Sequence, residues 1–367
     1  MKQHKKRTAF QIRSTGEDAY FAASNSARGF QSYYSACFDT ARIGRLYAVK
    51  GGPGTGKSRF LRTVSESGEA HGWHSELIYC SSDPDSLDGV ILTKAGREGI
   101  ALLDATAPHV YEPNRPGYRE EIVNLGAFWN ADLLRAAGGE IAERNRRKQE
   151  AYRMAYRYLA GYGEMTATRE ELVSSCLRKT AMRSFAEKWM RDIPEGEGFE
   201  EQIAICRAVG MRGLVALDTY YAKAKTAFYV EDCRGSAELF LRMLYEIAKE
   251  KKLSVRVSRD PLMPDRIDGL FLQRSGIAFL AFDGGDPATR RRISMRRFVE
   301  TAGLRAFGGD LNYAERMRRA MLEGALACFA QVCKAHFSVE ELYMRAMDFE
   351  AKETFTRAFC TTLFKEE

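Results

Sequence analysis

The sequence has no long apolar run. Its longest uninterrupted apolar stretches, such as Gly276–Phe282, are far shorter than the roughly 20 residues that cross a membrane. The basic start Met1–Arg7 is not followed by an apolar segment, so the pattern of a secretory signal is missing. We therefore expect a soluble, cytoplasmic protein with no membrane partner.

Patterns of disulfide and zinc binding are also missing. The eight cysteines are scattered along the chain and form no Cys-x-x-Cys pair. Cys328 and Cys333 have no cysteine or histidine partner at the spacing of a zinc site. Reduced thiols in a cytosolic protein are the expected state.

The composition is that of a globular protein, with 45% hydrophobic and 29% charged residues. A length of 367 residues favours two or three domains. The net charge of +7 permits an anionic partner, and a nucleotide is anionic enough to use it.

The two halves of the sequence resemble each other. Short identical stretches recur in the same order at an offset that shrinks from 180 to 177 to 170 residues. Collinear matches separated by small deletions are typical of a duplicated domain. The matching stretches are Phe60–Arg62 with Phe240–Arg242, Asp88–Gly89 with Asp268–Gly269, Gly99–Ala101 with Gly276–Ala278, Leu134–Ala136 with Leu304–Ala306, and Glu170–Leu172 with Glu340–Leu342.

Apolar strands alternate with helices in each copy, which predicts an α/β fold with a parallel sheet flanked by helices. The expected architecture is a tandem duplication of a P-loop NTPase domain, with domains at residues 1–195 and 196–367. The polar segment that ends in Asp-Gly is expected to be a loop. The remainder of each copy is expected to form a long helical hairpin, with helices at Ala131–Tyr162 and Arg169–Met190, and at Leu311–Lys334 and Val339–Phe364.

A phosphate-binding loop lies at Gly51–Ser58, which fits the Walker A pattern G-x-x-x-x-G-K-[ST] between an apolar strand and an amphipathic helix. Glycines let successive backbone N–H groups turn inward around phosphate oxygens, and the helix N-terminus adds a positive dipole end. Lys57 is expected to reach the β- and γ-phosphates, and the Ser58 hydroxyl to bind Mg²⁺. The residues expected to hold ATP are Gly51, Gly52, Pro53, Gly54, Thr55, Gly56, Lys57 and Ser58.

A Walker B strand is expected at Ile100–Asp104, an apolar segment that ends in a carboxylate. Asp104 would help to hold the hydrated Mg²⁺. No glutamate follows Asp104, so the acidic pair that many ATPases use to activate water is absent. Either another residue activates water or turnover is slow.

Three residues are candidates for that catalytic role. Asp83 and Asp85 lie in a polar segment after a strand, on the sheet edge where ligands bind in open α/β folds. Their alternative role is capping an Asp-Pro turn. His109 follows Asp104 closely and could sense the γ-phosphate, or be an ordinary surface histidine. Asp88 recurs in the second copy, so a structural role is expected for it.

The second copy carries Glu231–Glu238 in place of the loop. Ala237 replaces the lysine, Glu238 replaces the serine, and Ala281 stands at the Walker B position, with Asp283 two residues further on. Carboxylates in this segment would repel a triphosphate at short range. We expect no productive ATP binding there, and a structural or regulatory role for this half.

The whole chain resembles an uncharacterised bacterial family of tandem P-loop ATPases. The resemblance rests on Ser26–Phe30, Gly51–Ser58, Ser81–Gly89 and Asp104–His109, of which Ser81–Gly89 is the most specific. It implies ATP binding and a duplicated fold, and it implies no physiological role. Both halves carry an intact loop in that family, so this sequence departs from the pattern in its second half.

The first functional hypothesis is an ATP-binding protein that hydrolyses Mg-ATP slowly, or a switch whose helical arms move with nucleotide state and are read by a protein partner. A second is a small-molecule phosphotransferase, with the helical segment as a lid and Asp83 or Asp85 as the base. A third is a nucleic-acid-dependent ATPase, because Arg144–Lys148 precedes several tyrosines and basic and aromatic residues interleave there. The alternative for that segment is a solvated helix face.

An arginine finger is the last candidate. Arg290, Arg291 or Arg292 could be lent by the second half to the first site. The alternative is a solvated basic run.

Overall fold

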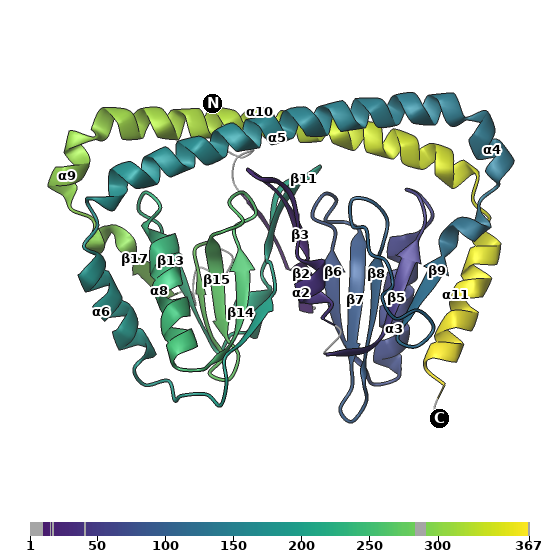
Figure 1. The fold of residues 1–367 in the computed structure, drawn as a ribbon, viewed down its shortest axis with the longest axis horizontal. Helices are drawn as coiled ribbons and strands as arrows, with labels where there is room; N and C mark the ends of the chain where they lie inside the picture. The colour runs from purple at the N-terminus through teal and green to yellow at the C-terminus, as the bar shows by residue number, and fades with distance from the viewer. Residues whose placement is uncertain (1–9, 15, 17, 40–41, 283–290, 366–367) are drawn as a thin grey trace.

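The computed structural model describes residues 10–14, 16, 18–39, 42–282 and 291–365. Two six-stranded sheets lie side by side, and two long helices run across both of them at one end (Figure 1). The architecture is mixed α/β. The expected positions Met1–Arg7, Asp283 and Arg290 lie outside the described residues.

The first sheet has the strand order β2-β6-β7-β8-β5-β9. Its strands are β2 (Asp18–Phe21), β5 (Ile43–Lys50), β6 (His74–Tyr79), β7 (Leu87–Thr93), β8 (Gly99–Asp104) and β9 (Glu120–Asn124). β5 lies between β8 and β9 and is parallel to both. Its buried residues form a nearly continuous apolar run, as expected for a strand covered on both faces.

The second sheet has the order β10-β14-β15-β16-β13-β17. Its strands are β10 (Glu200–Ile203), β13 (Thr226–Glu231), β14 (Ser254–Arg259), β15 (Ile267–Leu272), β16 (Ile277–Leu280) and β17 (Arg291–Ser294). Strand for strand, its order and its parallel and antiparallel pairings repeat those of the first sheet. The two halves therefore share one sheet topology.

The expectation of a parallel sheet is correct only in part, because one strand in each sheet runs against its neighbours. β7 is antiparallel to β6 and β8, and β15 is antiparallel to β14 and β16. The Asp88-Gly89 pair lies inside β7 and not in a loop. A Cβ on Gly89 would lie 2.5 Å from the ring of Phe38, so glycine allows this strand to pack closely although the pair reads as a turn signal.

One amphipathic helix follows each of β5 and β13, the strands next to an edge of their sheets. α3 (Lys57–Ala70) buries Phe60, Leu61 and Val64, and α8 (Ser236–Glu250) buries the matching Phe240, Leu241 and Leu244. The short helices are α2 (Tyr34–Cys37), η1 (Leu125–Phe128), α4 (Ala131–Ala136), α7 (Thr219–Lys223), η2 (Met295–Phe298) and α9 (Thr301–Ala306).

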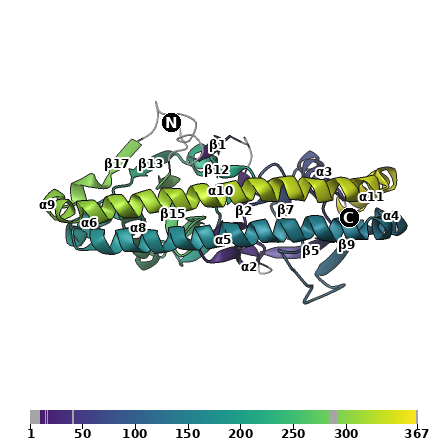
Figure 2. The ribbon, with the colours of Figure 1, turned by 90° about the horizontal axis from the view of Figure 1, so that it is seen from above.

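The expected helical hairpin within each copy is also corrected. α5 (Gly138–Ser174) is one continuous helix of 37 residues, and α10 (Gly308–Arg345) is one of 38 residues. They pack antiparallel against each other along their length (Figure 2). Ala155 and Leu159 of α5 meet Leu322, Ala325 and Phe329 of α10 in one buried cluster. α5 continues through residues 163–168, where the sequence predicted a break. Its apolar stripe packs against α10 of the other copy and not against a second helix of its own copy.

The helices that follow the long pair are exchanged between the halves. α6 (Lys179–Met190) buries Met182, Ala186 and Met190 in the core of the second sheet. α11 (Phe349–Leu363) packs on α3 of the first sheet, where Cys360 and the following Phe364 enter the core. The expected boundary between residues 195 and 196 therefore does not separate the two halves in space. The half around each sheet includes one helix from the other sequence copy.

Short strands join the two halves. β3 (Ala23–Ser26) and β4 (Gly29–Ser32) form a hairpin, and β1 (Gln11–Arg13) pairs with β12 (Gly213–Leu217), which also pairs with β11 (Arg207–Gly210). The Phe21 N–H donates to the Ile205 carbonyl across the junction at 2.8 Å. A shared buried cluster holds Tyr20 and Tyr220, so the halves have a continuous core.

Candidate nucleotide-binding site

The loop at Gly51–Ser58 connects the end of β5 to the start of α3. Gly54 and Gly56 have φ angles of 72° and 74°, in the left-handed region that side chains rarely adopt. The Thr55 hydroxyl donates to the Gly52 carbonyl at 2.9 Å. The chain therefore curls tightly before the helix begins at Lys57. This is the backbone shape that an anion-binding loop requires.

Lys57, at the start of α3, lies close to Asp104, at the end of β8. Asp104 is in register with Val49 across β8 and β5. The Lys57 Nζ lies 3.6 Å from the Asp104 carboxylate, and their side chains are only 12% and 14% exposed. Burial raises the pKa of Asp104, and the ammonium of Lys57 opposes that rise. The Lys57 ammonium also donates to the carbonyls of Gly51 and Gly52, at 2.9 and 2.8 Å.

Ser58 and Asp104 offer the oxygen ligands that Mg²⁺ prefers. The Ser58 hydroxyl accepts the N–H of Leu87 at 2.9 Å, which fixes its orientation and leaves one lone pair for a cation. One Asp104 oxygen accepts the Thr106 N–H at 2.9 Å, while the other faces Lys57. Thr106 also ties this edge to the loop, because its hydroxyl donates to the Gly51 carbonyl. The donor set therefore fits Mg²⁺.

The two carboxylates Asp83 and Asp85 are engaged by arginines. Arg212 Nε lies 3.1 Å from an Asp83 oxygen and 2.9 Å from an Asp85 oxygen, and Arg13 lies 2.6 Å from Asp85. Both arginines come from the strands that join the halves, since Arg212 lies between β11 and β12. Asp83 is buried and close enough to influence Glu340, whereas the Asp85 side chain is 48% exposed.

His109 is buried, and its ring packs face to face on Tyr34 with centroids 4.5 Å apart. Its Nε2 lies 3.1 Å from the Asp88 carboxylate. In the second half, the matching carboxylate Asp268 pairs instead with the buried Arg207 at 2.6 Å. His109 is thus no surface side chain, and the geometry makes it the partner of the buried carboxylate. Cys80 lies with them, and ligand atoms of the three residues are within 4.8 Å of one another, as a metal ion would require.

A second group of His, Asp and Glu with metal-ligand spacing consists of Asp18, His74 and Glu76, at the far edge of the first sheet. Asp18 already pairs with His74 and with Lys223. Glu76 pairs with Arg256. These contacts account for the carboxylates as links between the halves.

Residues from the second copy cover the loop. A Cβ on Gly52 would lie 2.8 Å from the Tyr343 ring, and one on Gly54 would lie 2.7 Å from the Glu340 carbonyl. The ammonium of Lys352, a fully buried side chain on α11, lies 3.4 Å from the same position on Gly56. Sequence reasoning missed all three. The only signal was the recurrence of Glu170–Leu172 at Glu340–Leu342.

Two further charged groups lie near the loop. Burial and the neighbouring Lys148 lower the pKa of His336 on α10, and Lys57 acts in the same direction. Burial also lowers the pKa of Lys148 on α5. Both long helices therefore bring titratable side chains to the edge of the sheet where the loop lies.

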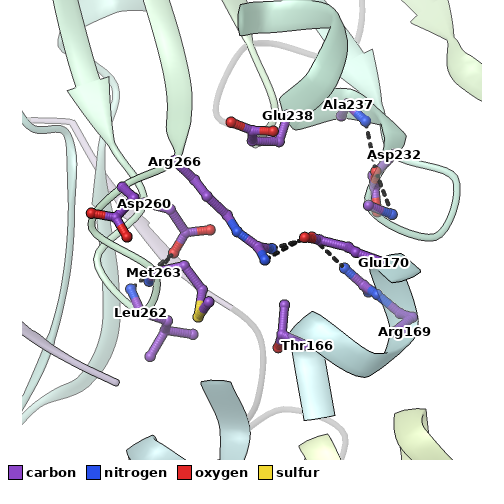
Figure 3. A network of polar contacts seen from close by, with 12 residues as sticks. Thr166, Arg169, Glu170, Asp232, Ala237, Glu238, Asp260, Leu262, Met263 and Arg266 are labelled. Carbon is purple, nitrogen blue, oxygen red and sulfur yellow. Dashed lines mark hydrogen bonds and ion pairs between the residues drawn. The ribbon is translucent and has the colours of Figure 1, made fainter. Parts of the chain in front are cut away.

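The loop of the second half is filled by its own side chain. The Asp232 carboxylate accepts the N–H groups of Gly235, at 3.0 and 2.9 Å, and of Ala237, at 2.9 Å (Figure 3). A carboxylate therefore takes the position of an anion at this helix N-terminus. A cavity of about 200 Å³ lies beside the loop. Its charged lining residues are Arg169, Glu170, Arg207, Asp232, Glu238, Asp260, Arg266, Asp268 and Arg318.

Most of these charges are paired. Arg266 makes a bidentate contact with Glu170, which comes from α5 (Figure 3). Arg318 of α10 pairs with Glu315 at 2.6 Å and donates to Tyr162 and Thr166. Within the described part of the chain, the ion pairs of Arg169 are long, at 3.8 Å to Glu170 and 3.7 Å to Glu315. The second loop is thus tied to both long helices by protein charges.

The basic and aromatic segment of α5 is largely satisfied within the chain. Arg146 pairs with Glu143 and Glu150, and Arg147 with Glu143. The Tyr152 hydroxyl donates to Ser82, and Tyr156 donates to Asn25. These two tyrosines point into the protein, so they are not available for stacking with bases.

The described members of the proposed arginine finger lie on β17. Arg292 pairs with Glu231, and the Arg291 guanidinium lies 5.8 Å from the centre of the Phe228 ring. Both contacts are within the second half. They give these arginines a local role at the edge of the second sheet.

No protein-family model, curated protein or solved structure matches the chain. Within the described part of the chain, no helix combines the length and the apolar character that a membrane crossing requires.

Proposed function

We propose that the chain binds Mg-ATP at Gly51–Ser58 and hydrolyses it slowly or uses it as a switch. The proposal includes a P-loop NTPase origin for both halves, and the identical strand order of the two sheets supports it. The observation that carries it is the position of Lys57, at the start of α3 and 3.6 Å from the carboxylate that ends β8. A lysine between a curled glycine loop and a strand-end carboxylate suits a triphosphate with its cation.

Each residue of the site has a role in this proposal. The N–H groups of the loop would receive phosphate oxygens, and Lys57 would exchange the carbonyls of Gly51 and Gly52 for the β- and γ-phosphates. Ser58 and Asp104 would hold Mg²⁺, which neutralises charge on the phosphate oxygens when bound. The raised pKa of Asp104 is consistent with a buried carboxylate that gains from a nearby cation.

Asp83 is the candidate that we assign to orienting water. Its negative charge contributes to the raised pKa of Glu340, and the ammonium of Lys57 opposes that rise. Asp85 is half exposed, and His109 is bound to Asp88. The contact with Arg212, 3.1 Å from Nε to the Asp83 carboxylate, would hold this carboxylate in position.

The test is an equilibrium titration with Mg-ATP. We expect one nucleotide per chain, and Lys57→Ala should weaken binding roughly 10- to 150-fold, since hydrogen bonds to charged groups contribute about 1.5–3 kcal/mol. Lys94→Ala is the matched control. Lys94 directly follows β7, at the end of the strand opposite to the one that contacts Ser58. Its ammonium donates to the His71 carbonyl. Equal affinity in wild type and Lys57→Ala, or saturation at two nucleotides, would contradict the proposal.

A further inference from the structure

The glutamate at position 340 contacts the phosphate loop from the other half of the chain. On α10, its carbonyl oxygen and its Cγ would lie 2.7 and 3.0 Å from a Cβ on Gly54. Burial raises the pKa of the Glu340 carboxyl, while Lys57 and the nearby backbone N–H of Gly54 oppose that rise. A carboxylate thus lies close to one of the backbone donors of the glycine loop.

These donors are the groups that bind phosphate in a loop of this type. Lys57 is engaged as well, because its ammonium donates to two loop carbonyls. In the described structure, the cation of the loop therefore binds protein oxygens. A phosphate oxygen at the Gly54 N–H would meet the negative charge of the Glu340 carboxylate beside it.

In the second half, the corresponding glutamate also lies against the loop, and an arginine holds it there. Glu170 is the counterpart of Glu340 at the offset of 170, and it lies against Gly235, with its carboxylate 3.1 Å from a Cβ there. Glu170 is anchored by Arg266, and Asp232 takes the loop donors. Ser86 stands at the position of Arg266 in the first half. Among the described residues, no arginine or lysine lies within ion-pair distance of the Glu340 carboxylate.

We propose that Glu340 is a displaceable occupant of the phosphate loop, so that a nucleoside triphosphate must expel its carboxylate in order to bind. This inference rests on the proposed function and names its regulation. Glu340 belongs to the helix that pairs with α5 over both sheets. Access to the first loop is therefore set by an element of the second copy, and the loop of the second half stays closed because its carboxylates are anchored.

The experiment compares Mg-ATP affinity in wild type, Glu340→Gln, Glu340→Ala and the control Glu341→Gln. Glu341 is exposed and pairs with Arg345 on the outer face of α10. Loss of the competing charge should tighten ATP binding about tenfold in both Glu340 variants, because a carboxylate beside the phosphates repels them. Glu341→Gln should bind as wild type does. Thermal unfolding of each variant establishes that it is folded.

Unchanged or weaker affinity in both folded Glu340 variants would overturn the inference. So would a fall in turnover of a hundredfold or more at constant affinity, which would make Glu340 the water-activating group. The proposed function fails in a different way, through absence of Lys57-dependent binding in wild type and variants alike. The two failures are therefore distinguishable.

Discussion

The loops that follow β5 and β13 stand on equivalent strands and are covered by equivalent parts of the long helices. Their charges differ. The first has Lys57, Asp104 and the buried Lys352 around its backbone donors, where the second has Ala237, Ala281 and Met182. The charged groups around the first loop would be stabilised by a bound ligand. Around the second loop, Asp232 accepts the backbone N–H groups, and Arg266 pairs with Glu170. In the second loop, a side chain thus supplies the anion at the helix N-terminus.

The comparison extends to the strand beside each loop. Asp88 and Asp268 are buried at matching positions, and they contact His109 and Arg207, respectively. Arg207 is also stacked on the rings of Phe10 and Phe282. The second half therefore contains a buried ion pair that has no full equivalent in the first.

The largest effect is expected from Asp83, which stands where the second half has Met263. Asp83→Asn should lower ATP turnover by roughly 10²–10⁴, the range for a lost general acid or base, with ATP affinity within a few-fold of wild type. Asp85→Asn is the control, since Asp85 shares Arg212 but is half exposed. Steady-state phosphate release measures both. Wild-type turnover in Asp83→Asn would remove it from the mechanism and leave His109→Gln to be measured.

Stability should separate the two buried aspartates. Asp268→Asn should lower the free energy of unfolding by about 3 kcal/mol, because it leaves the buried Arg207 guanidinium with only the more distant Asp260. Asp88→Asn should cost about 1 kcal/mol, since its partner is a histidine that can be neutral. Urea unfolding of the two variants gives the difference. Equal losses would show that the two halves stabilise this position in the same way.

Exchanging Lys352 for the residue of the second half sharpens the comparison further. Lys352→Met should weaken Mg-ATP binding roughly threefold to tenfold, because a buried cation beside Gly56 attracts phosphate. The melting temperature should not fall, since a buried charge is replaced by an apolar side chain of similar length. Lys188→Met, on the exposed face of α6, is the control. An unchanged affinity would assign Lys352 a purely structural role.

The smallest effect concerns the pH dependence of Asp104. Burial raises its pKa in the folded protein, so the folded state binds this proton more tightly than the unfolded state. The stability from the protonated carboxyl is then present at low pH and is lost as the pH rises through the raised pKa. At pH 7, Asp104→Asn should therefore match or exceed wild type in stability, by up to about 1 kcal/mol, while losing Mg²⁺-dependent ATP affinity. A variant less stable than wild type at pH 7 would contradict this sign.

Much of the first site follows from local sequence. The glycines, Lys57 and Ser58 are adjacent in the chain, and an apolar strand ending at Asp104 belongs beside the strand that precedes the loop. The repeated sheet topology was predictable because the sequence matches keep their order. These features depend on neighbours a few residues apart or on a repeated topology, and a sequence carries both directly.

Only the tertiary structure decided which helix covers which sheet. The apolar stripes of α5 and α10 predict helices that need a partner, but each stripe fits a helix of its own copy or of the other equally well. The course of α10 and α11 over the first sheet brought Glu340 and Lys352 to a loop almost 300 residues earlier in the chain. Packing within the first half made Asp88 and His109 a buried pair, with the His109 ring stacked on Tyr34, whereas their sequence context resembled a turn and a surface loop. Contacts of such sequence separation depend on the global packing of apolar surfaces, which no local pattern encodes.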